Sequence, residues 1–232
     1  MILKKYSKYF YLTLALSLFI SCSKVTDWQK FGVKKEVKNY TENYYDPVLK
    51  NKKWEKGKKS LFGHNRVSFD KDGNYQLIEY FTPEDQISGK VMPKREEGKV
   101  TEETFSLRDD TVINTTKIKY ISDTKQEFKV VDAEGNVTTD GKSLSKDNRI
   151  IKQKYTTFEG EEETEYLVTF EYDENGNMTS RKLIDGNGKV TFNYFYEYVD
   201  FDYFKNWTKR IDYDSEKKEK PINIVTREYA YY

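Results

Sequence analysis

Hydrophobic and polar residues alternate with a period of two along most of the chain after residue 33. In the run 168–172, valine, phenylalanine and tyrosine take one face while threonine and glutamate take the other. The runs 192–198 and 224–231 show the same alternation. Successive side chains of a strand point to opposite faces, so this pattern predicts half-buried β-strands, and no segment after residue 33 has helical spacing.

Short turns rich in aspartate, asparagine and glycine separate the predicted strands. These turns occupy residues 70–74, 132–136, 173–177 and 185–188. Glycine adopts positive φ at no steric cost, and Asp or Asn side chains hydrogen-bond to their own turn, so each turn predicts a hairpin. The turn glycines Gly73, Gly135 and Gly176 lie 62 and 41 residues apart. These gaps are close to three and two units of about 20.6 residues, which indicates a degenerate repeat of strand pairs.

The predicted fold is all-β, with roughly ten or more short strands. We expect an antiparallel meander of successive hairpins that forms an elongated, twisted or curved sheet, with a β-barrel or a sandwich as the alternative. The predicted organisation is a signal peptide at 1–22, a tether at 23–31 and a single domain at 32–232.

The first residues have the proportions of a secretory signal. Lys4, Lys5 and Lys8 precede an apolar run at 9–20. This run is shorter than the roughly 18–20 residues that span a bilayer, so it predicts a signal peptide rather than a membrane helix.

The signal ends at Cys22, the only cysteine of the chain, preceded by Ser21. The run 18–22 resembles a bacterial lipoprotein signal, although Phe19 stands where such signals usually have Leu, Val or Ile. The resemblance implies that Cys22 is lipidated and becomes the mature N-terminus. Acyl chains contribute about 0.8 kcal/mol per buried CH₂, so they would anchor the protein to a membrane. The alternative is an ordinary signal peptide with an incidental cysteine.

Residues 166–181 combine an aromatic strand, a Tyr-Asp pair, a Gly-Asn turn and a Thr/Lys/Arg strand. This unit resembles the YD (RHS-type) repeats of bacterial envelope proteins, and 194–213 is a second unit in which Lys205 replaces the usual glycine. The segments 32–37 and 227–232 resemble lipoproteins of this type from the Bacteroidetes. The resemblance implies a repeat architecture and a place in the cell envelope, expected at the outer membrane with its face left open. It implies no shared chemistry.

Composition excludes several classes of protein. The chain has 40 Lys+Arg, 39 Asp+Glu, one Cys and one His among 232 residues. Loss of the three signal lysines moves the net charge from +1 to about −2, which argues against a nucleic-acid partner. A single Cys and a single His exclude disulfides and Cys-rich or multi-histidine metal centres. We therefore expect no cofactor and no metal site.

No catalytic constellation is evident, and we assign no catalytic residue. The glutamates of 159–165 surround Gly160, and they favour a solvated hairpin tip over the two separated carboxyls of a glycosidase. His64 has no Cys partner or nucleophile elbow and is expected in a surface loop. The acidic turns lack the Gly and Glu positions of an EF-hand loop, so they are expected to be structural.

Aromatic content is the remaining functional signal, with 20 Tyr and 14 Phe. Most of these rings are expected to build the sheet, while Trp54 and Trp207 are candidate binding residues. The leading hypothesis is a non-enzymatic envelope lipoprotein, anchored in the membrane, that binds a protein or glycan through an aromatic-rich sheet surface or its hairpin tips. The alternatives are a secreted glycan hydrolase with paired carboxylates and a structural spacer. The oligomeric state is left open.

Overall fold

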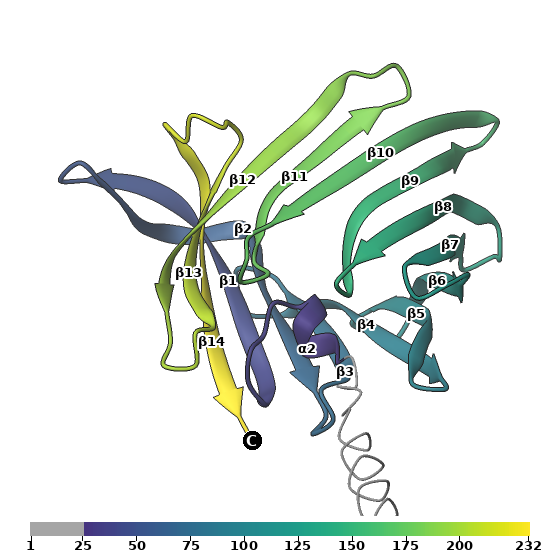
Figure 1. Ribbon diagram of the computed structural model, residues 1–232, viewed down its shortest axis with the longest axis horizontal. Coiled ribbons are helices and arrows are strands. Elements are labelled where there is room, and N and C mark those ends of the chain that lie inside the picture. The colour runs from purple at the N-terminus through teal and green to yellow at the C-terminus, as the bar shows by residue number, and fades with distance from the viewer. Residues whose placement is uncertain (1–25) are drawn as a thin grey trace, which may run out of the picture.

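The computed structural model describes residues 26–232, and the predicted signal peptide with Cys22 lies outside the described residues. A four-residue helix is followed by fourteen strands (Figure 1). Their bounds are α2 Asp27–Lys30, β1 Val37–Lys50, β2 Lys53–Phe69, β3 Tyr75–Phe81, β4 Ile87–Glu96, β5 Lys99–Leu107, β6 Val112–Tyr120, β7 Lys125–Asp132, β8 Val137–Lys146, β9 Arg149–Glu159, β10 Glu162–Tyr172, β11 Met178–Asp185, β12 Val190–Phe201, β13 Trp207–Tyr213 and β14 Pro221–Tyr231.

The strands form a closed antiparallel barrel in which each strand pairs with its neighbours in sequence. Closure comes from β14 pairing with β1, for example Tyr40 opposite Tyr229 and Glu42 opposite Arg227. The predicted all-β meander of hairpins is confirmed. The expectation of an open, elongated sheet was wrong, and the barrel alternative holds, because pairing the first strand with the last leaves no sheet edge to be covered.

One five-residue turn recurs at seven hairpins. In each, the first N–H donates to the fifth carbonyl oxygen and the fourth N–H donates to the first. The turns are 70–74, 82–86, 107–111, 132–136, 173–177, 185–189 and 202–206. The four turns expected from the sequence are confirmed, and Asp70, Asp132, Asp173 and Asp185 accept backbone N–H groups within their own turns.

Residues 26–36 form a segment that we call the plug, which lies across one end of the barrel (Figure 1). Trp28 donates its indole N–H to Val37 O at 2.9 Å, and Asp27 is buried. Residues 26–31, which the sequence assigned to the tether at 23–31, contact the barrel end. Trp28 and Phe31 pack on a buried cluster that includes Val33 and Phe69.

The plug contacts turns from around the same end of the barrel, which we call the plugged end. Asp27 N donates to Gly73 O in the β2–β3 turn and pairs with Arg95 near the β4–β5 turn. Lys34 N donates to Asn206 Oδ1 in the β12–β13 turn at 2.7 Å. The C-terminus joins this end through Tyr232 N, which donates to Glu36 O. The β6–β7, β8–β9 and β10–β11 hairpins lie at this end too, because alternate turns of a meander share an end. The other hairpins, including β1–β2 and β9–β10, form the opposite, distal end.

Candidate functional site: the inner wall of the barrel

The plug identifies the strand face that points into the barrel. The Phe31 ring lies 6.4, 5.5 and 5.4 Å from the rings of Tyr40 on β1, Phe69 on β2 and Tyr75 on β3. From β14, Arg227 Nη1 donates to Phe31 O at 3.0 Å. These strands turn this face toward the plug, and the strand register carries the same inner face around the barrel.

Most of the strand tyrosines and phenylalanines belong to the inner face. They are Tyr40, Tyr44, Phe69, Tyr75, Tyr80, Phe105, Tyr120, Phe128, Tyr155, Tyr166, Phe170, Tyr172, Phe192, Tyr194, Tyr196, Tyr198, Tyr229 and Tyr231. Gly89 and Gly141 supply room for two of these rings, because a Cβ at either position would lie 2.7 Å from Phe105 or 2.5 Å from Phe128. The aromatic excess is therefore concentrated inside the barrel.

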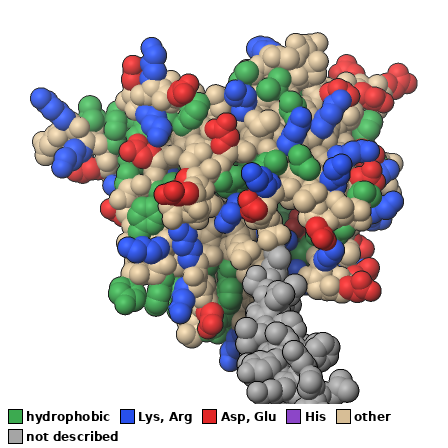
Figure 2. Space-filling view, in the orientation of Figure 1, with side chains coloured by type: hydrophobic (Ala, Val, Ile, Leu, Met, Phe, Trp, Pro, Cys, Tyr) green, Lys and Arg blue, Asp and Glu red, His purple; other side chains and the backbone are tan. Residues whose placement is uncertain are grey.

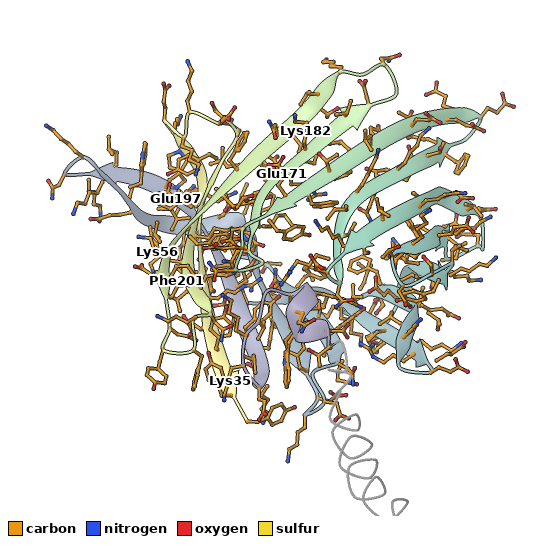
Figure 3. All side chains as sticks on the ribbon, in the orientation of Figure 1. Lys35, Lys56, Glu171, Lys182, Glu197 and Phe201 are labelled. Carbon is orange, nitrogen blue, oxygen red and sulfur yellow. The ribbon has the colours of Figure 1, made fainter. Side chains whose placement is uncertain are left out.

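The outer face is charged. Every strand from β3 to β14 carries a charged side chain there: Glu79, Lys90, Glu102, Lys117, Glu127, Lys129, Asp140, Lys142, Lys152, Lys154, Glu165, Glu171, Lys182, Glu197, Lys209 and Glu228. Cross-strand ion pairs join Lys129 to Asp140 at 3.3 Å and Glu127 to Lys142 at 3.1 Å. Figure 2 shows both signs of charge interspersed over the visible face, and Figure 3 shows Glu171, Lys182 and Glu197 on adjacent strands.

This charge pattern decides what the outer wall can face. A lysine or arginine facing hydrocarbon at mid-depth costs about 2–4 kcal/mol, and spanning barrels present an apolar band instead. Here the charges recur on neighbouring strands around the wall, so the costs would accumulate. The outer face is suited to water.

Two ion pairs lie on the inner wall where β12, β13, β14 and β1 meet. Arg227 Nε contacts Glu42 Oε2 at 2.6 Å, and both side chains are under a tenth exposed. Arg210 pairs with Asp212 through two contacts of 2.6 and 3.0 Å. The two arginines and two carboxylates balance in charge, as buried charges must to offset desolvation.

Aromatic rings enclose these ion pairs. The Arg227 guanidinium lies 4.1 Å from the ring centroids of both Tyr40 and Trp207, and Arg210 lies 5.1 Å from Trp207. Trp207 is therefore held between two arginines, with 2% of its surface exposed. We call Glu42, Arg210, Asp212, Arg227 and Trp207 the ionic cluster.

Burial and charge act in opposite directions on the carboxylates of the ionic cluster. Burial acts to raise the pKa of Glu42, but Arg227, Arg210 and the hydrogen bond from Tyr44 together bring it below its ordinary value. For Asp212, burial outweighs the attraction of Arg210, and the pKa is raised. Burial also raises the pKa of Tyr198 to about 12. These groups are tied to one another, which favours a structural role.

A third inner-wall arginine, Arg181 on β11, differs from the other two. Its guanidinium lies 5.2 Å from the Phe192 ring and 5.9 Å from the Phe170 ring, and the residue is exposed. Within residues 26–232 no carboxylate forms a salt bridge with it. Buried Val168 and Leu183 lie beside it on the same face.

Half-buried aromatic rings of β9, β10 and β12 lie beside Arg181 on the same inner face. Phe192 stacks on Tyr194 with centroids 4.8 Å apart and planes at 12°. Tyr155 and Tyr166 lie 5.3 Å apart, and burial raises the pKa of Tyr155 against the opposing charge of Arg181. We call Tyr155, Tyr166, Phe170, Arg181, Phe192 and Tyr194 the Arg181 patch. The arrangement offers flat apolar rings around an available cation, on the distal side of the plug.

The sequence-predicted binding residues fall in different places. Trp207 is buried in the ionic cluster, so it offers no free surface. Trp54 is half-buried on the β1–β2 hairpin, opposite Leu49. The structure does not bring the two together. Arg181 was missed by the sequence analysis, and its only signal was a lone arginine between aromatic strands.

The expected surface-loop position of His64 was wrong. His64 lies in β2 with 8% of its surface exposed, and it stacks on Phe81 at 4.3 Å because neighbouring strands bring the two rings together. The acidic run 159–165 does form an exposed hairpin end, as expected. Residues 26–232 contain no group of three or more His, Cys, Asp or Glu placed to hold a metal ion.

Comparison with known proteins gives distant structural likeness. No family model and no curated protein matches the chain. A porin-like protein from Bacteroides vulgatus ATCC 8482 is similar in structure, with a TM-score of 0.49 and 12% identity over 84% of this chain and 98% of that one. A porin-like protein from Bacteroides uniformis ATCC 8492 has a TM-score of 0.43 and 8% identity, over 85% and 98%. The likeness is too weak to transfer a property of those proteins. In the described part of this chain, no helix is long and apolar enough to cross a membrane.

Proposed function

We propose that this protein is a non-enzymatic lipoprotein of the cell envelope, whose barrel stands in water and binds an acidic glycan on its inner wall. The Arg181 patch carries the proposal. Arg181 is exposed between aromatic rings, while Arg210 and Arg227 are each paired with a carboxylate.

Anchoring is supported by two features. The sequence places a lipoprotein-type Cys22 just before the plug. The outer wall is charged on every strand from β3 to β14, so an acylated N-terminus would hold the barrel at a membrane without burying its wall.

The chemistry of the Arg181 patch selects the ligand class. A guanidinium binds carboxylate or sulfate oxygens through two parallel hydrogen bonds. Half-buried tyrosines supply flat apolar surfaces with a polar tip, which suit the faces of sugar rings. A glycan that carries uronic acid or sulfate groups fits both features.

The test compares two neighbouring residues of β11 that point to opposite faces. Arg181→Gln removes the inner-wall cation, and Lys182→Gln removes an outer-wall cation as the matched control. Binding of uronic acid oligosaccharides and their neutral counterparts is measured by calorimetry. We expect binding of the acidic set by the native protein, a loss of about tenfold or more in Arg181→Gln, and little change in Lys182→Gln.

Equal losses in the two variants would place the site elsewhere. Absence of binding to every acidic glycan, or turnover of one, would overturn the binding proposal.

A second candidate function is favoured by the β1–β2 hairpin, which projects beyond the barrel wall at the left of Figure 1. Six lysines lie on it, at 50, 52, 53, 56, 58 and 59, against Asp46 and Glu55. Leu49 is 59% exposed beside Trp54. An apolar tip with excess positive charge fits an acidic protein partner. Crosslinking from position 49 tests it, and loss of every crosslink in Trp54→Ala is the supporting result.

A further inference from the structure

The plugged end combines exposed aromatic rings with lysines. Tyr203 in the β12–β13 turn is 91% exposed, Phe204 is 37% exposed and the C-terminal Tyr232 is 47% exposed. Lys35 Nζ lies 5.6 Å from the Phe204 ring, and Lys71 Nζ lies 6.0 Å from the Tyr232 ring. Apolar side chains stand out over this turn at the lower left of Figure 2, and Figure 3 shows Lys35 near the C-terminal end of β14.

A basic depression adjoins these rings. It has a volume of about 440 Å³ and is lined by Lys34, Lys35 and Arg149, with Glu36 as the carboxylate of its lining. Arg149 lies over Tyr172, and its buried Nε has no hydrogen-bond partner among the described residues. Three cations against one carboxylate in this lining favour an anion such as a phosphate group.

We propose that the plugged end docks on the surface of the membrane, with Tyr203, Phe204 and Tyr232 at headgroup level and the basic depression against lipid phosphates. The inference rests on the proposed lipid anchor. Tyrosines and lysines of this kind are enriched where proteins meet the membrane–water interface, because a ring sits among headgroups while its polar tip or a neighbouring ammonium stays hydrated.

The position of the anchor supplies the second argument. The described chain begins at Thr26 in the plug, four residues after Cys22. An extended chain spans at most about 3.6 Å per residue, so an acylated Cys22 lies within about 14 Å of the plugged end. The anchor alone therefore brings this end close to the bilayer. The distal end, which is the end of the barrel nearer the Arg181 patch, then points away from the bilayer.

Fluorescence quenching in vesicles tests the docking. The full chain is isolated from membranes with Cys22 acylated, so that a cysteine introduced by Tyr203→Cys is the single free thiol for an environment-sensitive dye. Glu161→Cys, at the β9–β10 hairpin of the distal end, is the matched control. Both proteins are reconstituted into phosphatidylglycerol vesicles whose lipids carry a quencher at the headgroup.

We expect several-fold stronger quenching at position 203 than at position 161. We also expect the difference to shrink in phosphatidylcholine vesicles, or when Lys34→Gln and Lys35→Gln are combined, whereas combined Lys142→Gln and Lys154→Gln on the outer wall should leave it unchanged. Equal quenching at 203 and 161 in protein that still floats with the vesicles would overturn the docking and leave the anchor intact. Protein that does not float with the vesicles would overturn both.

Discussion

At the residue scale, the five-residue turns depend on one position. Their fourth residue has positive φ in every case: 81° at Gly73, 90° at Gly135, 79° at Gly176 and 82° at Gly188, but also 66° at Lys205. Residues with a Cβ pay about 1–2 kcal/mol in this region. The hydrogen bonds of the turn are retained at Lys205, so the turn tolerates the cost there.

Replacing Lys205 with glycine should therefore stabilise the protein. Relief of backbone strain exceeds the extra entropy that glycine loses on folding, for a net gain of about 0.5–1 kcal/mol. The measurement is the free energy of unfolding in urea. Gly135→Lys is the reciprocal control, since a Cβ there meets nothing within 4 Å, and it should destabilise by about 1–2 kcal/mol. Stabilisation by both substitutions, or by neither, would contradict the strain argument.

Gly141 is required for space and not for a positive φ. A Cβ at this position would lie 2.5 Å from the Phe128 ring and 2.6 Å from Tyr155 Cβ. Gly141→Ala should cost about 1–3 kcal/mol in urea unfolding. Gly186→Ala, where the nearest atom is 3.4 Å away, should change stability by less than about 0.5 kcal/mol. If Gly141→Ala left the free energy of unfolding unchanged, the Phe128 ring would not pack against this position as described.

The sequence predicted the glycine turns because Gly and Asp/Asn have local preferences. It did not predict the turns at 82–86 and 107–111, where Asp85 and Asp110 take the fourth position with φ of 63° and 69°. Aspartate adopts positive φ less readily than glycine, so these turns lack the glycine that marks the others. The closeness of Phe128 to Gly141 depends on strand register, so it was not predictable from composition.

At the element scale, three tyrosines tie a strand to the preceding one. Tyr172 on β10 donates its hydroxyl to Ile150 O on β9, Tyr198 on β12 donates to Met178 O on β11, and Tyr229 on β14 donates to Trp207 O on β13. All three distances are 2.9 Å. The same bond in the pairs β9–β10, β11–β12 and β13–β14 gives these three tyrosines a structural role.

Alternation along each strand predicted which residues share a face, but not which face lies inside. The outer face is charged, but the inner face also carries charged residues. These include Glu42, Arg181, Arg210 and Arg227. The ionic cluster joins residues from both ends of the chain, such as Glu42 and Arg227, which lie 185 positions apart. No local pattern could pair them.

The ionic cluster predicts a pH dependence of stability. The folded-state pKa of Glu42 is lowered, so its stabilising contribution is present above the unfolded pKa and is lost as pH falls toward the folded value. Glu42→Gln leaves Arg227 without its charge partner in a buried site, which should cost about 3–5 kcal/mol at neutral pH. The difference from the native protein should narrow in acid, where native Glu42 is itself protonated.

Urea unfolding from neutral pH into the acid range measures this dependence. Glu165→Gln removes an exposed pair with Lys154, 3.0 Å apart, and should cost about 0–1 kcal/mol at neutral pH. A Glu42→Gln cost no larger than that of Glu165→Gln, or a difference that grows in acid, would contradict the assignment.

At the scale of the whole molecule, closure and the plug were beyond the reach of sequence patterns. Closure depends on β1 meeting β14, an event set by the accumulated twist of fourteen strands rather than by any segment. Residues 26–31 of the plug were expected to belong to a polar tether. Trp28 and Phe31 instead bury their rings in the barrel end, because hydrophobic residues beside a hydrophobic opening pack into it.

The central claim is that the membrane holds this charged, water-facing barrel through its acylated N-terminus and not through its wall. The plugged end adds only surface contacts, which high salt weakens. The direct measurement inserts a site for a specific protease between Lys24 and Val25, treats isolated membranes with that protease in high salt, and sediments them. Our account predicts that a folded barrel, beginning just before Thr26, appears in the supernatant after cleavage and stays in the pellet without it. A barrel that is cleaved yet remains in the membrane pellet would contradict the account, because its wall would then be held by the bilayer itself.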